Sequence, residues 1–393
     1  MRLNIGFCIL LTENVAHFLL KYMVRKWVRS CEAVAREYIL AINPGSTSTK
    51  VAIFKGEKNT VQKNLSHSAE EVEKYAKISD QHKYREKMIQ SWLKEIGIGT
   101  EKLAAVVGRG GLLKPMPGGT YKVTDAMIED LNIGVQGEHA SNLGGIIAKG
   151  MADPEGIPAF IVDPVAVDEF EEIARISGMP DLPRKSLVHA LNIKAVARRA
   201  AKDMGRDIKD VNFIVAHLGG GISISPLSKG RILDVNGAND GGPFSPERAG
   251  GLPVGEIIKM CYSGKYTLSE MKKKTVGKAG LVGYLGTNDA RDVVSMIESG
   301  DKNADFIFDA MAYQIAKEIG SMATVLKGEI DSIILTGGLA YSELLCGRIA
   351  RRVGFIAPVK IYAGEDEMQA LAEGANRVLK GEEKAKIYEE EVK

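Results

Sequence analysis

The strongest constraint on the fold is one local plan of strand, small-residue turn and strand, which occurs twice in the chain. The first copy is residues 38–55 (YILAIN, PGSTST and KVAIFK), and the second is residues 213–226 (FIVA, HLGGG and ISISP). Each copy continues into a predicted third strand, at 60–67 and at 231–235. Two three-stranded meanders with the same kind of first turn indicate a repeated unit of structure.

Both meanders are followed by alternating helices and strands. The first is followed by predicted helices at 84–96 and 125–133 and strands at 103–107 and 159–163, and the second by helices at 306–326, 343–353 and 367–379 and strands at 332–336 and 359–362. This alternation predicts an α/β fold with a largely parallel core. Asn43 and His217 occupy equivalent positions in the two copies, so we expect a duplicated domain and not a solenoid.

The length of the chain supports two domains, since 393 residues exceed the ~150 of one typical domain. We expect a first domain at 38–165, a second at 166–366, and a carboxy-terminal helix at about 367–393 that packs back on the first. Residues 1–37 precede the first strand and are expected to be an amino-terminal extension outside the fold.

The extension has neither an apolar run of the ~18 residues that a membrane span needs nor a secretory cleavage site. A membrane-surface helix is the alternative, because Leu19, Met23 and Trp27 would share one helical face beside basic residues. We expect no membrane partner.

Composition narrows the function. Lys+Arg 52 against Asp+Glu 50 is too balanced for a dedicated nucleic-acid binder. The four cysteines are too far apart in sequence for a metal knuckle and fit a reducing compartment, so we expect a cytoplasmic protein.

The turns between the first and second strands of the two meanders have related chemistry; they are called the first turn (residues 44–49) and the second turn (residues 217–221). The first turn offers hydroxyls from Ser46, Thr47 and Ser48 and a charge from Lys50, while the second leaves its backbone uncovered at residues 219–221 (GGG). Such turns expose N–H groups that bind anions, although a tight hairpin alone also needs Gly and Ser. Neither turn is a Walker loop or a G-x-G-x-x-G motif. Their matching positions predict a nucleotide held between two domains.

Three motifs resemble the acetate and butyrate kinase (acetokinase) family of the sugar kinase, actin and heat-shock chaperone superfamily. Residues 42–53 (INPGSTSTKVAI) resemble its first signature and residues 216–223 (AHLGGGIS) its second phosphate loop. Residues 236–253 (NGANDGGPFSPERAGGLP) resemble the butyrate kinases of that family most closely. The resemblance implies duplicated ribonuclease-H-like (actin-like ATPase) domains with a nucleotide cleft between them. It also implies reversible, direct in-line phosphoryl transfer between ATP and butyrate or a branched short-chain acid.

The resemblance also implies which residues act. Arg109 and Arg248 would flank the point where the acyl carboxylate meets the γ-phosphate, His189 would contact the phosphoryl group in flight, and Asp163 would orient the active-site arginine. Without the resemblance, a lone histidine at a helix start is a capping or core residue, and an aspartate before proline is a turn residue.

The remaining expected site residues bind nucleotide, metal or acyl chain. Those for the nucleotide are Asn43, Ser46, Thr47, Ser48, Lys50, His217, Gly219, Gly220, Gly221, Asp289, Arg291, Gly337 and Gly338. Mg²⁺ is expected at Asn43 and Glu367, with Glu365 and Asp366 as alternatives for the acid. Gly111 and Val188 stand where acetate kinases carry valine and phenylalanine, and are expected to leave room for a longer acyl tail.

Two alternatives remain open from sequence. One is an acetate or propionate kinase, and the other is a non-metabolic ATPase of the same superfamily. The partners expected are a small carboxylate and ATP or ADP, in a homo-oligomer. The preferred acid and the direction of the reaction are not fixed by sequence.

Overall fold

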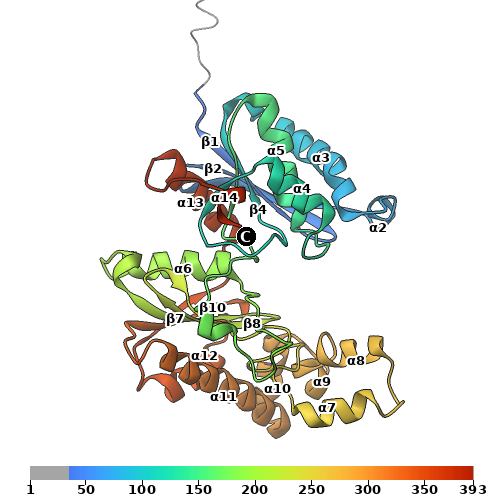
Figure 1. Cartoon of the computed structure of the whole chain (residues 1–393), viewed down its shortest axis with the longest axis vertical. Helices are drawn as coiled ribbons and strands as arrows, with labels where there is room; N and C mark the ends of the chain where they lie inside the picture. The colour runs from blue at the N-terminus through green and yellow to red at the C-terminus, as the bar shows by residue number, and fades with distance from the viewer. Residues whose placement is uncertain (1–34, 393) are drawn as a thin grey trace, which may run out of the picture.

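The structure is a computed structural model that describes residues 35–392 and builds them into two mixed β-sheets (Figure 1). The first sheet has the strand order β12-β5-β6-β4-β1-β2-β3, and the second has the order β11-β10-β7-β8-β9. The first comprises β1 (Tyr38–Pro44), β2 (Ser48–Lys55), β3 (Lys58–Ser66), β4 (Leu103–Arg109), β5 (Thr120–Lys122), β6 (Ala159–Val162) and β12 (Lys386–Ile387). The second comprises β7 (Asn212–Leu218), β8 (Ile222–Ser228), β9 (Arg231–Ile232), β10 (Ser332–Gly337) and β11 (Val359–Ala363).

The two sheets share one topology. β1 pairs antiparallel with β2 and parallel with β4, and β7 pairs in the same way with β8 and β10. β6 and β11 then extend the parallel part of each sheet. Asn43 and His217 are each next to last in their strands, so the repeat seen in the sequence places them at equivalent sheet edges.

Helices cover both faces of the first sheet. On one face lie α3 (His82–Glu95), α4 (Asp125–Ile133) and α5 (Asn142–Ala152), and on the other lies α13 (Glu367–Leu379). Because successive residues of a strand point to opposite faces, Leu40 and Ile42 of β1 join the first cluster, and Ile39 and Ala41 join the second. This two-sided burial explains why YILAIN is apolar almost throughout.

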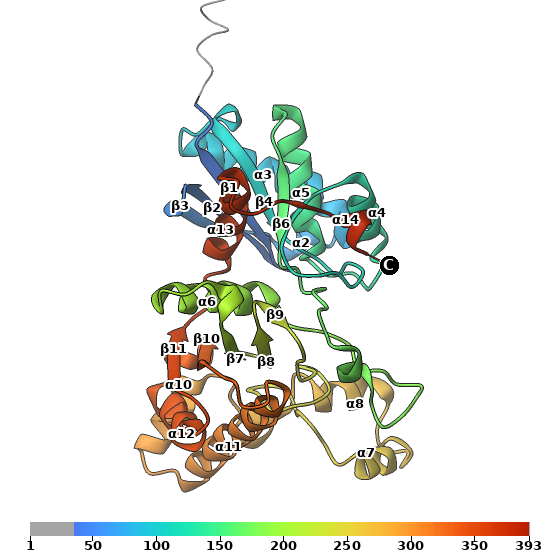
Figure 2. The ribbon, with the colours of Figure 1, turned by 60° about the vertical axis from the view of Figure 1, so that its left-hand side comes forward.

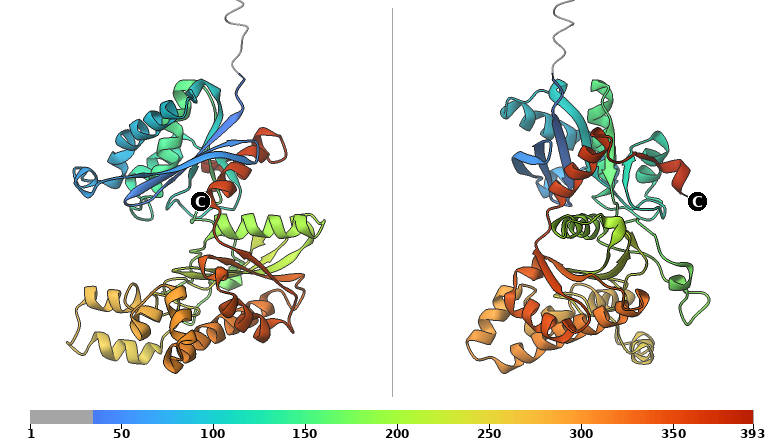
Figure 3. Two further views of the ribbon diagram at one scale, coloured as in Figure 1. Left: turned by 180° about the vertical axis from the view of Figure 1, so that it is seen from behind. Right: turned by 90° about the vertical axis from the view of Figure 1, so that its left-hand side faces the viewer.

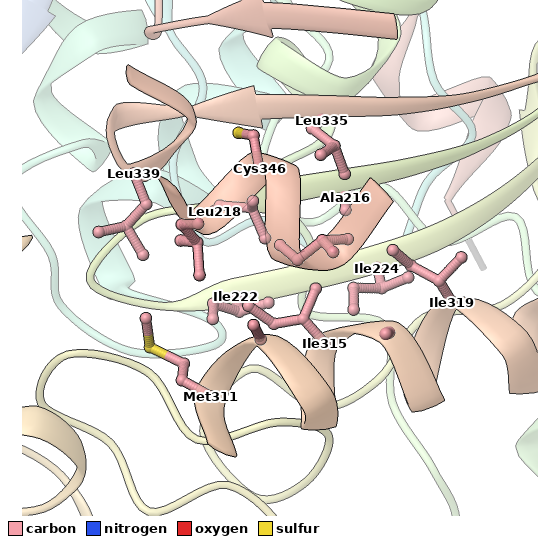
Figure 4. Close-up of a cluster of buried hydrophobic side chains, with 14 of the residues drawn as sticks. Ala216, Leu218, Ile222, Ile224, Met311, Ile315, Ile319, Leu335, Leu339 and Cys346 are labelled. Carbon is pink, nitrogen blue, oxygen red and sulfur yellow. The ribbon is translucent and has the colours of Figure 1, made fainter. Parts of the chain in front are cut away.

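The second sheet is also covered on both faces. α11 (Lys302–Val325) and α12 (Glu343–Val353) pack on one face, where Ile315 and Ile319 lie against Ala216 and Ile224 (Figure 4). α6 (Ala190–Asp203) covers the opposite face, against Phe213 and Val215 of β7.

α6 and α13 form the layer between the two sheets (Figure 2). α13 follows β11 of the second sheet but packs on β1, β4 and β6 of the first, and it also contacts α6. The chain therefore crosses between the sheets twice, after β6 and after β11, and both crossings begin at strand ends that face the site described below.

The other helices lie at the periphery. They are α2 (Ala69–Val72), α7 (Val254–Cys261), α8 (Leu268–Thr275), α9 (Gly280–Leu285), α10 (Ala290–Glu298) and α14 (Tyr388–Glu391), with short 3₁₀ turns that include η1 (Ile78–Gln81) and η6 (Gly338–Tyr341). α7 and α8 project from the end of the molecule away from the first sheet (Figure 3). Among the described residues, no helix is both long and apolar enough to cross a membrane.

Two expectations need correction. The third strand of the second meander ends at Ile232 and not at residue 235, because Asp234 and Val235 turn aside to bind Arg184. Arg36 and Glu37, assigned to the extension, contact the fold, since Arg36 donates to the Glu155 carbonyl at 2.8 Å and Glu37 pairs with Lys55 at 2.7 Å. Residues 1–34 lie outside the described part of the chain, and the alternative of a membrane-surface helix lies there with them.

Candidate active site

The candidate site lies where the carboxyl ends of β1 and β4 face those of β7 and β10. In open α/β sheets, ligands bind at the carboxyl ends of the strands. Asn43 and Arg109 come from the first sheet, and His217 comes from the second. The loop before α13 adds Glu365, and the first residue of that helix is Glu367.

Glu367 joins the two first-sheet residues. Its carboxylate accepts from Asn43 Nδ2 at 2.5 Å and pairs with Arg109 Nη1 at 3.1 Å. The neighbouring Asp366 caps α13 by accepting from the Gln369 backbone N–H, so its carboxylate has a local structural role. Of the three acidic residues considered for the metal, Glu367 is the one that contacts Asn43.

Glu365 faces the second sheet instead. Its Oε1 lies 3.1 Å from His217 Nε2, and His217 Nδ1 lies 2.9 Å from Asn192 Nδ2. A carboxylate only accepts hydrogen bonds, so the His217 proton sits on Nε2, and Nδ1 accepts from the Asn192 amide. The hydrogen bond that Glu365 accepts from His217 Nε2 is the main cause that lowers the pKa of Glu365. Nothing in the sequence indicated Asn192, which is a buried residue of α6.

His189 stacks directly on His217. The ring centroids are 4.0 Å apart with an interplanar angle of 10°, and His189 Nδ1 lies 2.9 Å from Ser223 Oγ. Burial first, then His217, Arg109 and Arg248 lower the pKa of His189 to about 3, against the opposing charge of Glu365. Burial and the nearby positive charges therefore keep His189 a neutral imidazole at neutral pH.

Arg248 reaches the second turn because that turn has no side chain in its way. A Cβ added to Gly221 would lie 2.4 Å from Arg248 Nη1, so only glycine leaves room for the guanidinium. Nη1 donates to Asn239 Oδ1 at 2.8 Å and to the Ala238 carbonyl at 3.2 Å. Arg248 Nε is buried without a hydrogen-bond partner in the described part of the chain.

Asp163 contacts a different arginine from the one expected. Its carboxylate pairs with Arg198 Nη1 of α6 at 3.0 Å and accepts from the Gly119 N–H at 2.7 Å. Arg109 pairs with Glu367 instead. In this structure Asp163 does not orient Arg109; it joins the end of β6 to α6 from a backbone with φ of 38°.

A cavity of about 1050 Å³ lies against the second turn, the start of α10 and η6. Gly219 and Gly220 of that turn line it together with Glu365, and Asp289 and Arg291 line it beside α10. Gly338 also lines it. Gly337 does not line it but packs against the Leu218 backbone, where a Cβ would be 2.4 Å from the carbonyl oxygen. The cavity spans the expected phosphate and nucleoside ends, and its volume suits a nucleotide.

A second cavity, of about 640 Å³, lies against the first turn. Its polar lining includes the expected Asn43, Ser46, Ser48, Lys50 and Arg109, whereas Thr47 is an exposed turn residue outside it. Two further residues, Arg85 and His139, also line it. Burial and Arg109 lower the pKa of His139. Sequence reasoning missed both, because a lone arginine in a helix and a lone histidine in a loop carry no motif.

The two residues expected to widen an acyl pocket are packed against protein. A Cβ on Gly111 would lie 2.4 Å from Asn142 Oδ1 and 2.6 Å from Asn142 Cα. Val188 is 2% exposed and belongs to the hydrophobic cluster around α6. Neither residue lines a cavity described above, so their small size has a packing reason in this structure.

The chain is similar to several known proteins. The acetokinase family model matches residues 182–356. "Probable butyrate kinase 2" of Caldanaerobacter subterraneus subsp. tengcongensis is 59% identical over 350 residues, covering 89% of this chain and 99% of the relative. "Butyrate kinase 1" of Clostridium acetobutylicum is 57% identical over 351 residues, with the same coverage of 89% and 99%.

The fold is also found in a solved structure. The crystal structure of Porphyromonas gingivalis acetate kinase superposes with a TM-score of 0.72 at 20% identity, covering 87% of this chain and 100% of that one. This confirms the expected α/β fold with duplicated actin-like ATPase domains. Given close relatives that it matches over nearly their whole length, the chain belongs to the acetokinase family.

Proposed function

We propose that the protein is a butyrate kinase, which transfers the γ-phosphoryl group of ATP reversibly to butyrate or a branched short-chain acid. The observation that carries this is the convergence of Arg109, His189 and Arg248 between two anion-binding turns. Arg109 pairs with Glu367, and Glu365, two residues earlier, contacts His217. His189 stacks on His217, and Arg248 lies beside Gly221 of the second turn. The names of the relatives, butyrate kinases 57–59% identical to this chain, support the choice of acid.

The reaction needs positioning and charge stabilisation more than covalent chemistry. The substrate carboxylate is itself the nucleophile, and charge spreads over the equatorial oxygens of the transferring group. We assign Arg109 and Arg248 to stabilise that charge, because a planar guanidinium fork fits phosphoryl and carboxylate oxygens. His189, neutral at pH 7, adds a hydrogen bond without adding a charge.

The nucleotide is proposed to lie along the larger cavity. Its phosphates would meet the uncovered backbone of Gly219 and the N–H groups of Gly220 and Gly221, because the Gly219 N–H donates to the Gly221 carbonyl. Its nucleoside would meet Asp289 and Arg291. His217, held in one tautomer by Asn192 and Glu365, presents its ring beside the phosphate end.

We further propose Mg²⁺ as the metal, held by Glu367 with Asn43. Oxygen donors suit this ion, and no cluster of three His, Cys, Asp or Glu exists among the described residues. That donor set fits Mg²⁺, which keeps several waters and binds through one or two carboxylates and the phosphates. When bound, it would neutralise phosphate charge.

We propose that the protein is cytoplasmic and forms a homo-oligomer. α7 buries none of its residues, and Val254, Ile258, Tyr262 and Leu268 on and beside it are exposed. Exposed apolar groups gathered at one place suit a contact between copies. Sedimentation at several protein concentrations tests this, and a monomer at all of them would contradict it.

Initial rates of ADP formation on acids of increasing length test the proposed substrate. We expect butyrate or a branched relative to give a higher kcat/KM than acetate. An acetate or propionate kinase would show the reverse order, and a non-metabolic ATPase would release ADP without any acid.

A further inference from the structure

A buried guanidinium lies beneath the first turn of the site. Arg85, in the first turns of α3, is 1% exposed. Its hydrogen-bond partners in the described part of the chain are all neutral. Burial lowers the pKa of Arg85 to about 10, which leaves the group charged at neutral pH. A buried charge without an opposite charge is costly, so its position calls for an explanation.

The partners of Arg85 are concentrated in that turn. Nη1 donates to the carbonyls of Gly45 and Ser48, at 2.8 and 3.2 Å, and to Thr49 Oγ1 at 3.0 Å. Nη2 donates to the Ser46 carbonyl at 3.3 Å. Three carbonyls of one tight turn are thus drawn toward one side chain.

The orientation of these carbonyls fixes the orientation of the N–H groups. In a trans peptide the C=O and the N–H point in opposite directions. Since the carbonyls of Gly45 and Ser46 face Arg85, the N–H groups of Ser46 and Thr47 point away from it. Neither donates to another protein group in the part of the chain that the structure describes. Free N–H groups on consecutive residues form an anion-binding nest.

The hydroxyl of Thr49 connects Arg85 to a second buried residue. Thr49 Oγ1 accepts from Arg85 and lies 2.8 Å from His67 Nε2, within hydrogen-bond distance. Burial and Arg85 lower the pKa of His67 to about 4, so the ring is neutral at neutral pH. This second contact fixes the start of β2 against the end of β3.

On the basis of the proposed phosphoryl transfer, we propose that Arg85 is a positioning residue for the terminal phosphate of the nucleoside triphosphate. It holds the Gly45–Thr49 turn with its N–H groups directed at that phosphate. Its uncompensated positive charge is balanced when the phosphate binds. Arg85 does not bind the phosphate directly; it acts on the phosphate by holding the turn in place.

Nucleotide binding by Arg85→Ala, measured by calorimetry with ATP and with ADP, separates this role from a structural one. We expect the variant to lose about tenfold in affinity for ATP, a cost of about 1.4 kcal/mol, and little for ADP, which lacks the terminal phosphate. The kcat should fall about 100-fold, as misplaced catalytic groups do. Guanidinium ion added to the folded Arg85→Ala protein should restore part of the lost kcat. Arg348→Ala is the control, because Arg348 is 9% exposed and pairs with Asp305 away from both cavities.

Equal losses of ATP and ADP affinity in Arg85→Ala, or no loss, would overturn the inference. If that variant does not fold, Arg85→Lys serves, since lysine keeps the charge but has a single nitrogen for the five acceptors of Arg85. It should still lose ATP affinity selectively. A wild-type protein that binds ATP but phosphorylates no acid would refute the proposed function. The ATP and ADP comparison would still decide the role of Arg85.

Discussion

The rings of His189 and His217 are stacked face to face, 4.0 Å apart between centroids. One comes from the start of α6 and the other from the end of β7, so the stack fixes a helix of the middle layer to the edge of the second sheet. Two imidazolium ions would repel each other in this arrangement. The stack therefore depends on at least one neutral ring, and the lowered pKa of His189 meets that need.

Acid should destabilise the protein through His189. Its pKa is about 3 when folded and about 6.5 when unfolded, so between these values the unfolded chain binds the extra proton. The contribution of His189 to the free energy of unfolding is then fully present above pH 6.5. It is lost as the pH falls toward 3, by up to about 2 kcal/mol between pH 6.5 and 5. Urea unfolding at several pH values checks this. His189→Gln should flatten the slope, while His82→Gln, which leaves the stack intact, should not; equal slopes in His189→Gln and wild type would contradict the account.

Arg248 should matter for rate more than for binding. Arg248→Ala removes the fork that Gly221 makes room for, and we expect kcat to fall about 10³-fold, as for arginines at phosphoryl-transfer sites. Arg248→Lys keeps the positive charge but lacks the planar guanidinium fork, so it should recover only part of the wild-type kcat. Steady-state kinetics on both substrates decide the matter, because an effect confined to KM for the acid would mean that Arg248 only binds substrate.

Asp163 should contribute mainly to stability through Arg198. Asp163→Ala leaves the Arg198 guanidinium and the Gly119 N–H without their partner, and we expect a loss of about 3 kcal/mol, as when a buried pair is broken. Arg198→Met should cost at least as much, because it leaves the Asp163 carboxylate, which is 0% exposed, buried without its counter-charge. Chemical denaturation of both variants tests this. A stable Asp163→Ala with a large fall in kcat would instead support a direct role at the reacting groups.

Filling the space at Gly111 should not change acyl preference. Even Gly111→Ala brings a Cβ to 2.6 Å from Asn142 Cα, and such overpacking costs about 1–3 kcal/mol. We expect a lower melting temperature and equal fractional losses of activity on acetate and butyrate. A selective loss on butyrate would restore the interpretation, drawn from sequence, that Gly111 borders the acyl tail.

The repeat and several elements could be predicted because local signals were strong. α12 and α13 begin and end where the sequence placed them, as each begins after a capping residue, Ser342 or Asp366. The equivalence of Asn43 and His217 followed from matching turns.

What sequence could not supply were the partners formed by tertiary packing. Arg109 meets Glu367 across 258 residues, and Asp163 meets an arginine on a helix face that carries no motif. Arg85 looked like any helical arginine, since its role depends on carbonyls brought to it by the turn between β1 and β2. Gly111 was interpreted as open space because sequence shows an absent side chain but not the neighbour, Asn142, that takes its place.

The most direct test of the central proposal is formation of an acyl phosphate, trapped with hydroxylamine, alongside ADP from ATP, Mg²⁺ and butyrate. The account predicts equal amounts of hydroxamate and ADP, both dependent on the acid, and both nearly abolished in Arg248→Ala. ADP release that proceeds equally without any carboxylate, with no hydroxamate formed, would contradict it.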